Sequence, residues 1–283
     1  MIFRILFLSI FSVFLSLNSI SIAIAAPVAG PALRLLVQEG TSSSGESEYS
    51  SKKYQQLATV LGTYLKREIQ VTGLSPLRQY DADAIRQGDI LIARPNAVAG
   101  MAIQTLGFVP VVALDSGIKS QMTLVGPASL KKNFKSPDEL KKLRFAMPPA
   151  DSEVTRQALR LLAGMGFKPE TSNVYNVQLQ ATIPFALENK LADVGVVKSD
   201  STVAPKLAAA GYVVLAEGEK AAPWVMLANK KLGAELIDQV RVAMTGMMSN
   251  AEHKAALQGL RVQNVVEADP QPYVNAYNRY NGK

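Results

Sequence analysis

The chain has 283 residues, 48% of them hydrophobic, which is enough for a full core in one or two domains. Its net charge is +7, but the basic residues occur singly or in pairs and no long basic run appears, which argues against a nucleic-acid partner. The sequence contains no cysteine, which excludes disulfides, thiol chemistry and thiolate metal sites.

The N-terminus resembles a signal peptide. Arg4 is followed by an uncharged apolar run over residues 5–26, which ends in Ala23-Ile24-Ala25. These are the small residues that a signal peptidase requires at positions −3 and −1. We therefore expect residues 1–25 to be cleaved near Ala25, leaving an exported, periplasmic protein. The alternative is an uncleaved membrane anchor, because the run is almost long enough to span a bilayer.

After this segment, short β-branched runs alternate with longer helical patterns, which is typical of an α/β fold. In the first part we expect a strand at 33–38, a Ser/Gly-rich loop at 39–51, a helix at 52–69, a strand and bend at 71–79, a short helix at 81–89, a strand at 89–95, a helix at 96–107, and extended segments at 108–115 and 120–127.

In the second part a capping-box spacing at Ser136 and Glu139 predicts a helix start. We then expect strands at 143–147, 173–179 and 192–197, helices after 153, at 182–191 and at 203–211, extended segments at 212–217 and 223–229, and a helical tail at 234–248, 251–260 and 270–280. Tyr273, Tyr277 and Tyr280 form a stripe on the last helix, which we expect to pack the tail onto a domain.

This order predicts two α/β domains joined by two crossovers. Domain 1 would comprise residues 26–118 plus 216–283, and domain 2 residues 119–215. Two connections of this kind form a hinge around a cleft. Ligands of open α/β sheets bind at the carboxyl ends of strands. The expected strand ends are residues 38–44, 93–96, 148–153, 178–182 and 198–201.

The turn before the helix at 153 is the most informative of these ends. The first N–H groups of a helix can hold an anion, but Asp151 and Glu153 in this turn would repel one. Asp151 is a plausible N-cap, and Glu153 is favourable near the helix dipole. Two interpretations stay open: the turn lines a ligand site, or its acidic residues only cap their own helix.

The motifs of catalysis are missing from the sequence. No G-x-S-x-G occurs, the single histidine, His253, lies in a polar helical stretch, and no carboxylates have the spacing of a calcium loop. The loop GTSSSGESEY lacks the G-K-[ST] ending of a phosphate loop and is either a flexible surface loop or a ligand loop. We expect no enzymatic activity, no cofactor and no metal.

Several segments, YQQLATVLGTYLKREI, IRQGDILIARPNAVA, SPDELKKLRFAMPPADS, LLAGMGFKPE and ALENKLADVGVV, resemble in order and spacing the periplasmic solute-binding proteins of the phosphate, phosphite and phosphonate ABC transporters. The likeness covers nearly all of the chain after residue 25. It implies a two-domain type II periplasmic binding fold, with hinge crossovers and a central cleft, that closes on a ligand and delivers it to a membrane permease. It also implies no catalytic activity and no metal.

The resemblance also suggests where a ligand would sit. The family's hydroxyl-rich turn corresponds to residues 150–153, of which only Ser152 matches. Gln180 stands at the family's histidine position and Lys198 at that of a carboxylate, while the family's Gly-Pro turn is Arg94-Pro95. Arg94 and Lys198 would supply positive charge if both face the cleft. The candidate ligand-binding residues are Gly40, Thr41, Ser42, Arg94, Asn96, Thr123, Asp151, Ser152, Glu153, Gln180 and Lys198.

The function expected from these observations is the capture of a small polar solute, phosphate- or phosphonate-like, for an ABC-type transporter. The partners would be that solute and an inner-membrane permease, and a monomer is expected. The alternative is a binding-protein fold with a degenerate cleft, acting as a sensory or accessory partner of a membrane receptor or a periplasmic enzyme, because a fold does not fix a function.

Overall fold

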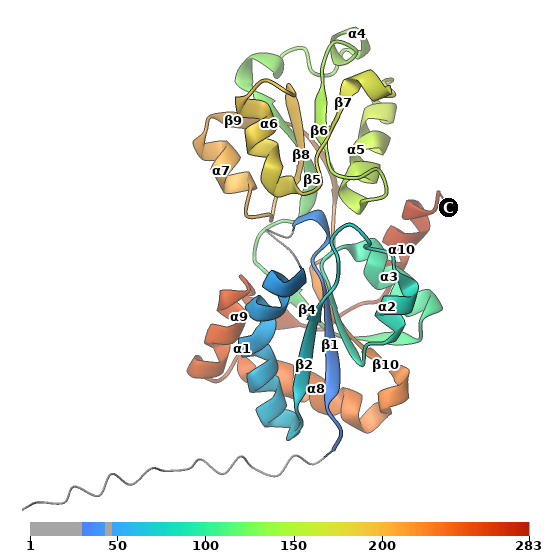
Figure 1. Ribbon diagram of the computed structural model, residues 1–283, viewed down its shortest axis with the longest axis vertical. Helices are drawn as coiled ribbons and strands as arrows, with labels where there is room; N and C mark the ends of the chain where they lie inside the picture. The colour runs from blue at the N-terminus through green and yellow to red at the C-terminus, as the bar shows by residue number, and fades with distance from the viewer. Residues whose placement is uncertain (1–29, 43–46, 283) are drawn as a thin grey trace, which may run out of the picture.

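The computed structural model describes residues 30–42 and 47–282 and consists of two lobes, one above the other (Figure 1). Each lobe contains one β-sheet with helices on both faces. The expected signal peptide and residues 43–46 of the Ser/Gly-rich loop lie outside the described residues. Among the described residues no helix is both long enough and apolar enough to cross a membrane.

The first lobe is built on a six-stranded sheet in the order β11-β4-β10-β3-β1-β2. Its strands are β1 (Leu33–Gln38), β2 (Ile69–Gly73), β3 (Ile90–Ala93), β4 (Phe108–Asp115), β10 (Trp224–Asn229) and β11 (Asn264–Val266). Strands β2 and β3 pair with β1 in parallel, whereas β10 runs antiparallel to both β3 and β4. The parallel strands therefore end at the edge of the lobe that faces the second lobe (Figure 1).

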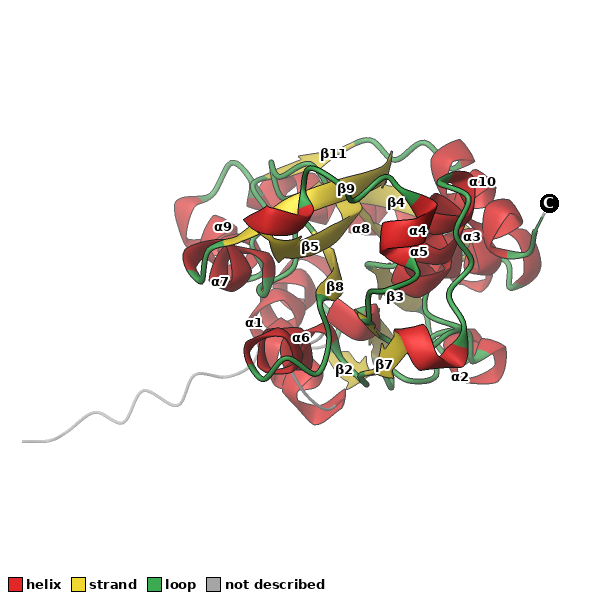
Figure 2. Cartoon of the chain, turned by 90° about the horizontal axis from the view of Figure 1, so that it is seen from above, coloured by secondary structure: helices red, strands yellow, loops and turns green. Residues whose placement is uncertain are grey.

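Alternation along β1 divides the core of this lobe between the two faces of the sheet. Leu35 and Val37 face the helices α1 (Ser47–Leu65), α8 (Ala234–Met247) and α9 (Ala251–Gly259). Leu36 faces α2 (Ala82–Arg86), α3 (Asn96–Thr105) and α10 (Gln271–Tyr280). Seen from above, α1 and α9 lie on one side and α3 and α10 on the other (Figure 2).

The second lobe has a five-stranded sheet in the order β7-β6-β8-β5-β9. Its elements are β5 (Gln121–Pro127), α4 (Pro137–Leu140), β6 (Phe145–Met147), α5 (Glu153–Gly164), β7 (Val174–Asn176), α6 (Ile183–Glu188), β8 (Val194–Lys198), α7 (Ala204–Ala209) and β9 (Tyr212–Lys220). Helices α4 and α5 cover one face, and α6 and α7 the other.

Two short segments, residues 116–120 and 221–223, connect the lobes. Strand β9 pairs with β5 as far as Lys220, so the chain returns later than the expected domain limit at residue 216. The division into domains at the expected residues stays a prediction. Asn96 holds the return segment from the first lobe: its amide donates to the Ala222 carbonyl at 3.2 Å and accepts from the Ala222 N–H at 2.9 Å.

Most expected elements form near their expected positions, with three local differences. The first long helix covers residues 47–65 instead of 52–69, because Lys66 adopts a left-handed φ of 52° and Ile69 already belongs to β2. Ser136 precedes α4 but makes no side-chain capping bond, so the expected capping box does not form. Strand β11 is an addition that the sequence did not indicate.

The tyrosine stripe packs the tail onto the first lobe, as predicted. Tyr273 is buried among α3 and the sheet, and Tyr277 packs against the same core. Gly100 permits this contact, since a Cβ there would lie only 2.1 Å from the Tyr273 carbonyl oxygen. Helix α10 thus runs alongside α3 and extends its C-terminal end toward the second lobe (Figures 1 and 2).

Candidate functional site

The strand ends of the two lobes meet around a small cavity of about 20 Å³, here called the central cavity. The first lobe contributes the turn after β1, the Arg94-Pro95 turn after β3 and Gln79; the second lobe contributes the start of α5, Gln180 and Lys198. A volume of this size holds about one water molecule. The lobes are therefore closed on each other.

Most of the residues expected in the site do meet here. Gly40, Thr41, Ser42, Arg94, Glu153, Gln180 and Lys198 line the central cavity, together with the unanticipated Glu39, Gln79, Pro95, Val154 and Gln157. The other expected residues do not line it. Asn96 holds the return segment, and Thr123 donates to the Val197 carbonyl inside the sheet. Asp151 is exposed, and Ser152 is buried in the helix cap.

Gln180 joins the lobes by hydrogen bonds at the end of the cavity. Its amide nitrogen donates to the hydroxyls of Thr41 and Ser42, both at 3.1 Å, and its carbonyl oxygen accepts from the Lys198 N–H at 2.8 Å. The side chains of Thr41, Ser42 and Gln180 could each bind a ligand, but in the closed molecule the two hydroxyls are occupied by the Gln180 amide.

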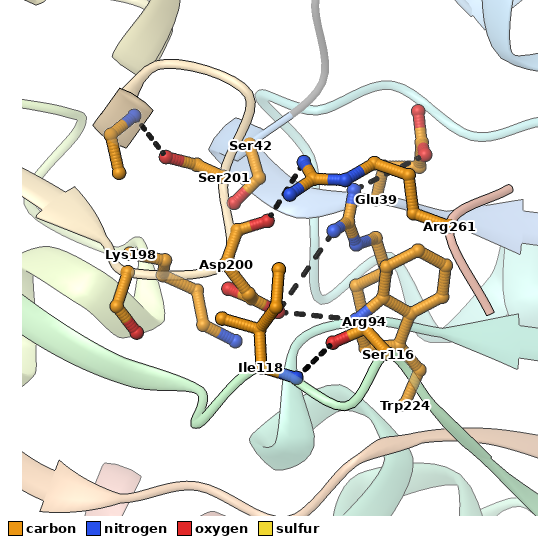
Figure 3. Close-up of polar contacts among 12 residues, drawn as sticks. Glu39, Ser42, Arg94, Ser116, Ile118, Lys198, Asp200, Ser201, Trp224 and Arg261 are labelled. Atoms are coloured by element: carbon orange, nitrogen blue, oxygen red, sulfur yellow. Dashed lines mark hydrogen bonds and ion pairs between the residues drawn. The ribbon is translucent and has the colours of Figure 1, made fainter. Parts of the chain in front are cut away.

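Arg94 lies at the centre of a buried charge network (Figure 3). Its guanidinium stacks 3.7 Å from the ring centre of Trp224 and lies 3.6 Å from Glu39 and 3.9 Å from Asp200. Glu39 also accepts a 2.6 Å bond from Lys53. Burial works to raise the pKa of Glu39, but the charges of Lys53 and Arg94 outweigh it and hold this pKa below its usual value.

Asp200 is the second acid of this network, and the candidate residues did not include it. It accepts from the indole N–H of Trp224 at 3.2 Å. Burial works to raise its pKa, but the charges of Lys198 and Arg94 lower it overall. The sequence had marked residues 198–201 as a strand end, which was the available signal, but it did not indicate that Trp224, at the start of β10, would bind there.

Glu153 reaches from the second lobe to the start of α3 in the first. Its carboxylate accepts from the Ala97 N–H at 3.2 Å and from the Gln157 amide at 3.0 Å. Burial raises the pKa of Glu153, although the charge of Lys198 opposes the shift. The protein's own carboxylate therefore occupies the position at a helix N-terminus that suits an anion.

The expectation that Asp151 caps α5 is wrong. Ser152 is the N-cap, with extended backbone geometry and a side chain that accepts from the Thr155 N–H at 3.3 Å. Asp151 lies one residue too early, so its carboxylate cannot take the capping position. Glu153 lies in the first turn of α5 as expected, but its carboxylate bonds to α3 instead.

Positive and negative groups balance around the central cavity. The acids Glu39, Glu153 and Asp200 are matched by Arg94, Lys198 and Lys53. In residues 30–42 and 47–282 no group of three or more acidic, histidine or cysteine side chains is arranged to hold a metal. His253 lies outside the site and bonds to Tyr64.

Comparisons with known proteins agree with this architecture. The model of a family described as the periplasmic substrate-binding protein of phosphonate ABC transporters matches residues 40–273. A Prochlorococcus marinus protein solved with methylphosphonate is 14% identical, with 89% of this chain and 98% of that chain covered and a TM-score of 0.70. No match is found among curated protein sequences.

Two further solved structures are similar at the level of the fold. A Xanthomonas citri protein bound to ATP is 14% identical, with a TM-score of 0.68 over 89% of this chain and 98% of that chain. A binding component of a Pseudomonas aeruginosa phosphonate transporter is 15% identical, with a TM-score of 0.67 over 89% of this chain and 85% of that chain. The fold is that of type II periplasmic binding proteins, as the sequence predicted. The chain belongs to the periplasmic substrate-binding proteins of phosphonate ABC transporters, a family of transport proteins and not of enzymes.

Proposed function

We propose that this protein captures a small polar solute in its interlobe cleft and delivers it to the permease of an ABC-type transporter, and that the solute is a zwitterion and not a fully ionised phosphonate. The observation that carries the proposal is the contact of the Glu153 carboxylate with the Ala97 N–H. An incoming solute that binds at the start of α3 must displace this carboxylate, and the displaced carboxylate then lies next to the solute.

The charge balance of the cleft argues against a dianion as solute. Arg94 is already engaged by Glu39, Asp200 and the ring of Trp224. A phosphonate dianion could bind the N–H groups at the start of α3 and the charge of Lys198. It would then lie beside Glu153 and Asp200 and would compete with these carboxylates for their partners. Buried charges without partners are costly, so such an ion would be held poorly.

A zwitterion fits the same groups without adding net charge. Its acidic group would take the place of the Glu153 carboxylate at the start of α3, and its basic group would pair with the displaced carboxylate. The solute classes with this chemistry are small amino acids and aminophosphonates. The methylphosphonate bound by the Prochlorococcus relative lacks the basic group and is the natural comparison ligand.

Calorimetric titration of the full chain with alanine, 2-aminoethylphosphonate, methylphosphonate and phosphate tests the proposal. The two zwitterions should bind and the two simple anions should not. A bound zwitterion at about 100 times its Kd should also add roughly 2.7 kcal/mol to the free energy of unfolding.

The variant Glu153→Gln should reverse this preference, losing about tenfold in zwitterion affinity and gaining methylphosphonate affinity, since an ion pair of this kind is worth about 1.4 kcal/mol or more. Asp151→Asn is the matched control, because Asp151 is exposed two residues earlier and should leave both affinities unchanged. Tight methylphosphonate binding by the native chain, unaffected by Glu153→Gln, would contradict the proposal.

A second function is supported by the size of the central cavity. At about 20 Å³ the closed cleft accommodates no solute until it opens. If none of the four ligands binds and the closed state persists, the protein is better explained as an accessory or sensory partner of a membrane receptor or periplasmic enzyme. Pull-down from membranes with the closed protein would then be the next experiment.

A further inference from the structure

A second and much larger cavity lies between the lobes, outside the central cavity. Its volume is about 530 Å³, which falls in the range of small-molecule sites. Its walls are α5 of the second lobe, the end of β9 with the return segment, and α10 of the first lobe, with Asn96 at the start of α3. We call it the outer pocket.

The charges of the outer pocket are unbalanced. Arg160 on α5, Lys220 at the end of β9 and Arg279 on α10 line it, with Glu219 as its one acidic lining residue. These four side chains carry a net charge of +2. Glu219 pairs with Arg279 at 3.4 Å but is 77% exposed, so this pair contributes little.

Two of the three cations have no carboxylate partner. Neither Arg160 nor Lys220 makes an ion pair within 4.0 Å in the described parts of the chain. Burial, and after it the nearby charge of Arg279, lowers the pKa of Arg160, although the charges of Glu219 and Glu153 oppose the shift. The guanidinium groups of Arg160 and Arg279, from different lobes, therefore repel each other across the pocket. An anion between them would relieve this repulsion.

The remaining walls suit an organic molecule more than a bare ion. Asn275 and Gln157 provide amide groups, whereas Pro272, Ala276 and Leu161 provide apolar surface. Both helices thus carry a basic group beside amide and apolar surface, a combination that matches the general composition of small-molecule sites.

The outer pocket exists only while the lobes are closed, because its walls come from both. Next to it Tyr280 of α10 donates to the Asp151 carbonyl at 2.8 Å, and Arg156 of α5 donates to the Tyr280 carbonyl at 2.9 Å. Figure 1 shows the end of α10 near the lower end of α5. A ligand held by both Arg160 and Arg279 would therefore favour the closed arrangement.

We propose that the outer pocket is a second binding site, for a small organic anion with two or more negative charges, either an organic phosphate or a polycarboxylate, held between Arg160 and Arg279. This site lies outside the central cavity, although Gln157 lines both.

Calorimetric titration of the full chain at low ionic strength tests the site, with pyrophosphate and citrate as separate probes for the two chemistries. One of them should bind, and Arg160→Gln and Arg279→Gln should each weaken its binding about tenfold. Glu219→Gln should tighten it about threefold, because the acidic lining residue is removed. Added salt should weaken binding, since the groups are partly exposed.

Two controls separate this site from other basic surfaces. Arg241→Gln removes an exposed arginine on α8, paired with Asp238, and should change nothing. Lys198→Gln alters the central cavity and should also leave the probe affinity unchanged. The proposal is overturned if neither probe binds, if Arg160→Gln and Arg279→Gln bind as tightly as the native chain, or if Lys198→Gln weakens binding as much as they do.

Discussion

The central cavity and the outer pocket lie between the same two lobes, but their basic groups are paired with acids in the first and largely unpaired in the second. Around the central cavity buried carboxylates match the basic groups, and the space left is about 20 Å³. Around the outer pocket three basic residues face one exposed acid, and the space is about 530 Å³. The difference teaches that basic residues between lobes are available to a ligand only where the protein has not already paired them.

This contrast also separates two kinds of arginine. Arg94 is buried, stacked on Trp224 and engaged with two carboxylates, so it belongs to the core of the closed molecule. Arg160 is partly exposed and has no carboxylate within 4.0 Å among the described residues. The first arginine stabilises the fold, whereas the second remains free to bind.

The largest predicted effect is on stability and tests this separation directly. Arg94→Ala should lower the free energy of unfolding by about 3 to 5 kcal/mol, because it leaves Glu39 and Asp200 buried with less compensation. Arg160→Ala should change it by no more than about 0.5 kcal/mol, as for other surface substitutions. Urea unfolding at pH 7 measures both. Equal losses for the two variants would break the comparison.

The sequence predicted the places of the central site better than its contacts. Strand ends such as Gly40–Ser42, Arg94 and Lys198 could be found because strand and turn patterns are local, and parallel strands bring their ends to one edge. The bond from Ala97 to Glu153 could not, because it joins residues 56 positions apart on different lobes. The first-turn position of Glu153 indicated only a local role at its own helix.

The outer pocket had no sequence signal at all. Arg160, Lys220 and Arg279 lie on three elements about 60 residues apart, and each alone is an ordinary basic residue of a helix or strand. Their meeting depends on how the closed lobes are placed relative to each other, and on α10 following α3. Local pattern and period determine neither of these.

Glu153 provides a test of the charge balance in the central cavity. Its folded pKa is raised, so its ionised form is disfavoured by folding, and this cost develops as the pH rises above the unfolded value of about 4.5. Glu153→Gln should therefore raise the free energy of unfolding at pH 7 by about 1 kcal/mol. This gain in stability should vanish at acidic pH, where the Glu153 side chain of the native chain is neutral like the glutamine of the variant. Urea unfolding of both proteins across this pH range measures the difference.

Glu39→Gln is the matched control with the opposite sign. The pKa of Glu39 is lowered on folding, so its stabilisation is present above the unfolded value and is lost as the pH falls through the folded one. This variant should be less stable than the native chain at pH 7 and approach it in acid. If both variants change stability in the same direction at pH 7, the two carboxylates do not differ as the comparison requires.

The smallest predicted effect concerns the contact that joins the lobes beside the outer pocket. Tyr280→Phe removes the bond to the Asp151 carbonyl but keeps the stacking of the ring on Tyr80 and the Arg156 guanidinium above it. The free energy of unfolding should fall by only about 0.5 to 1 kcal/mol, because Asp151 is exposed and water can satisfy its carbonyl. Tyr277→Phe in the same helix is the control, since its hydroxyl has no hydrogen bond to the described residues. Urea unfolding, with and without the anion proposed for the outer pocket, measures the stability of both variants. Because the bond closes the lobes around that pocket, Tyr280→Phe should also weaken the binding of the anion, whereas Tyr277→Phe should not. Equal anion affinities in the two variants would mean that the outer pocket forms without this contact.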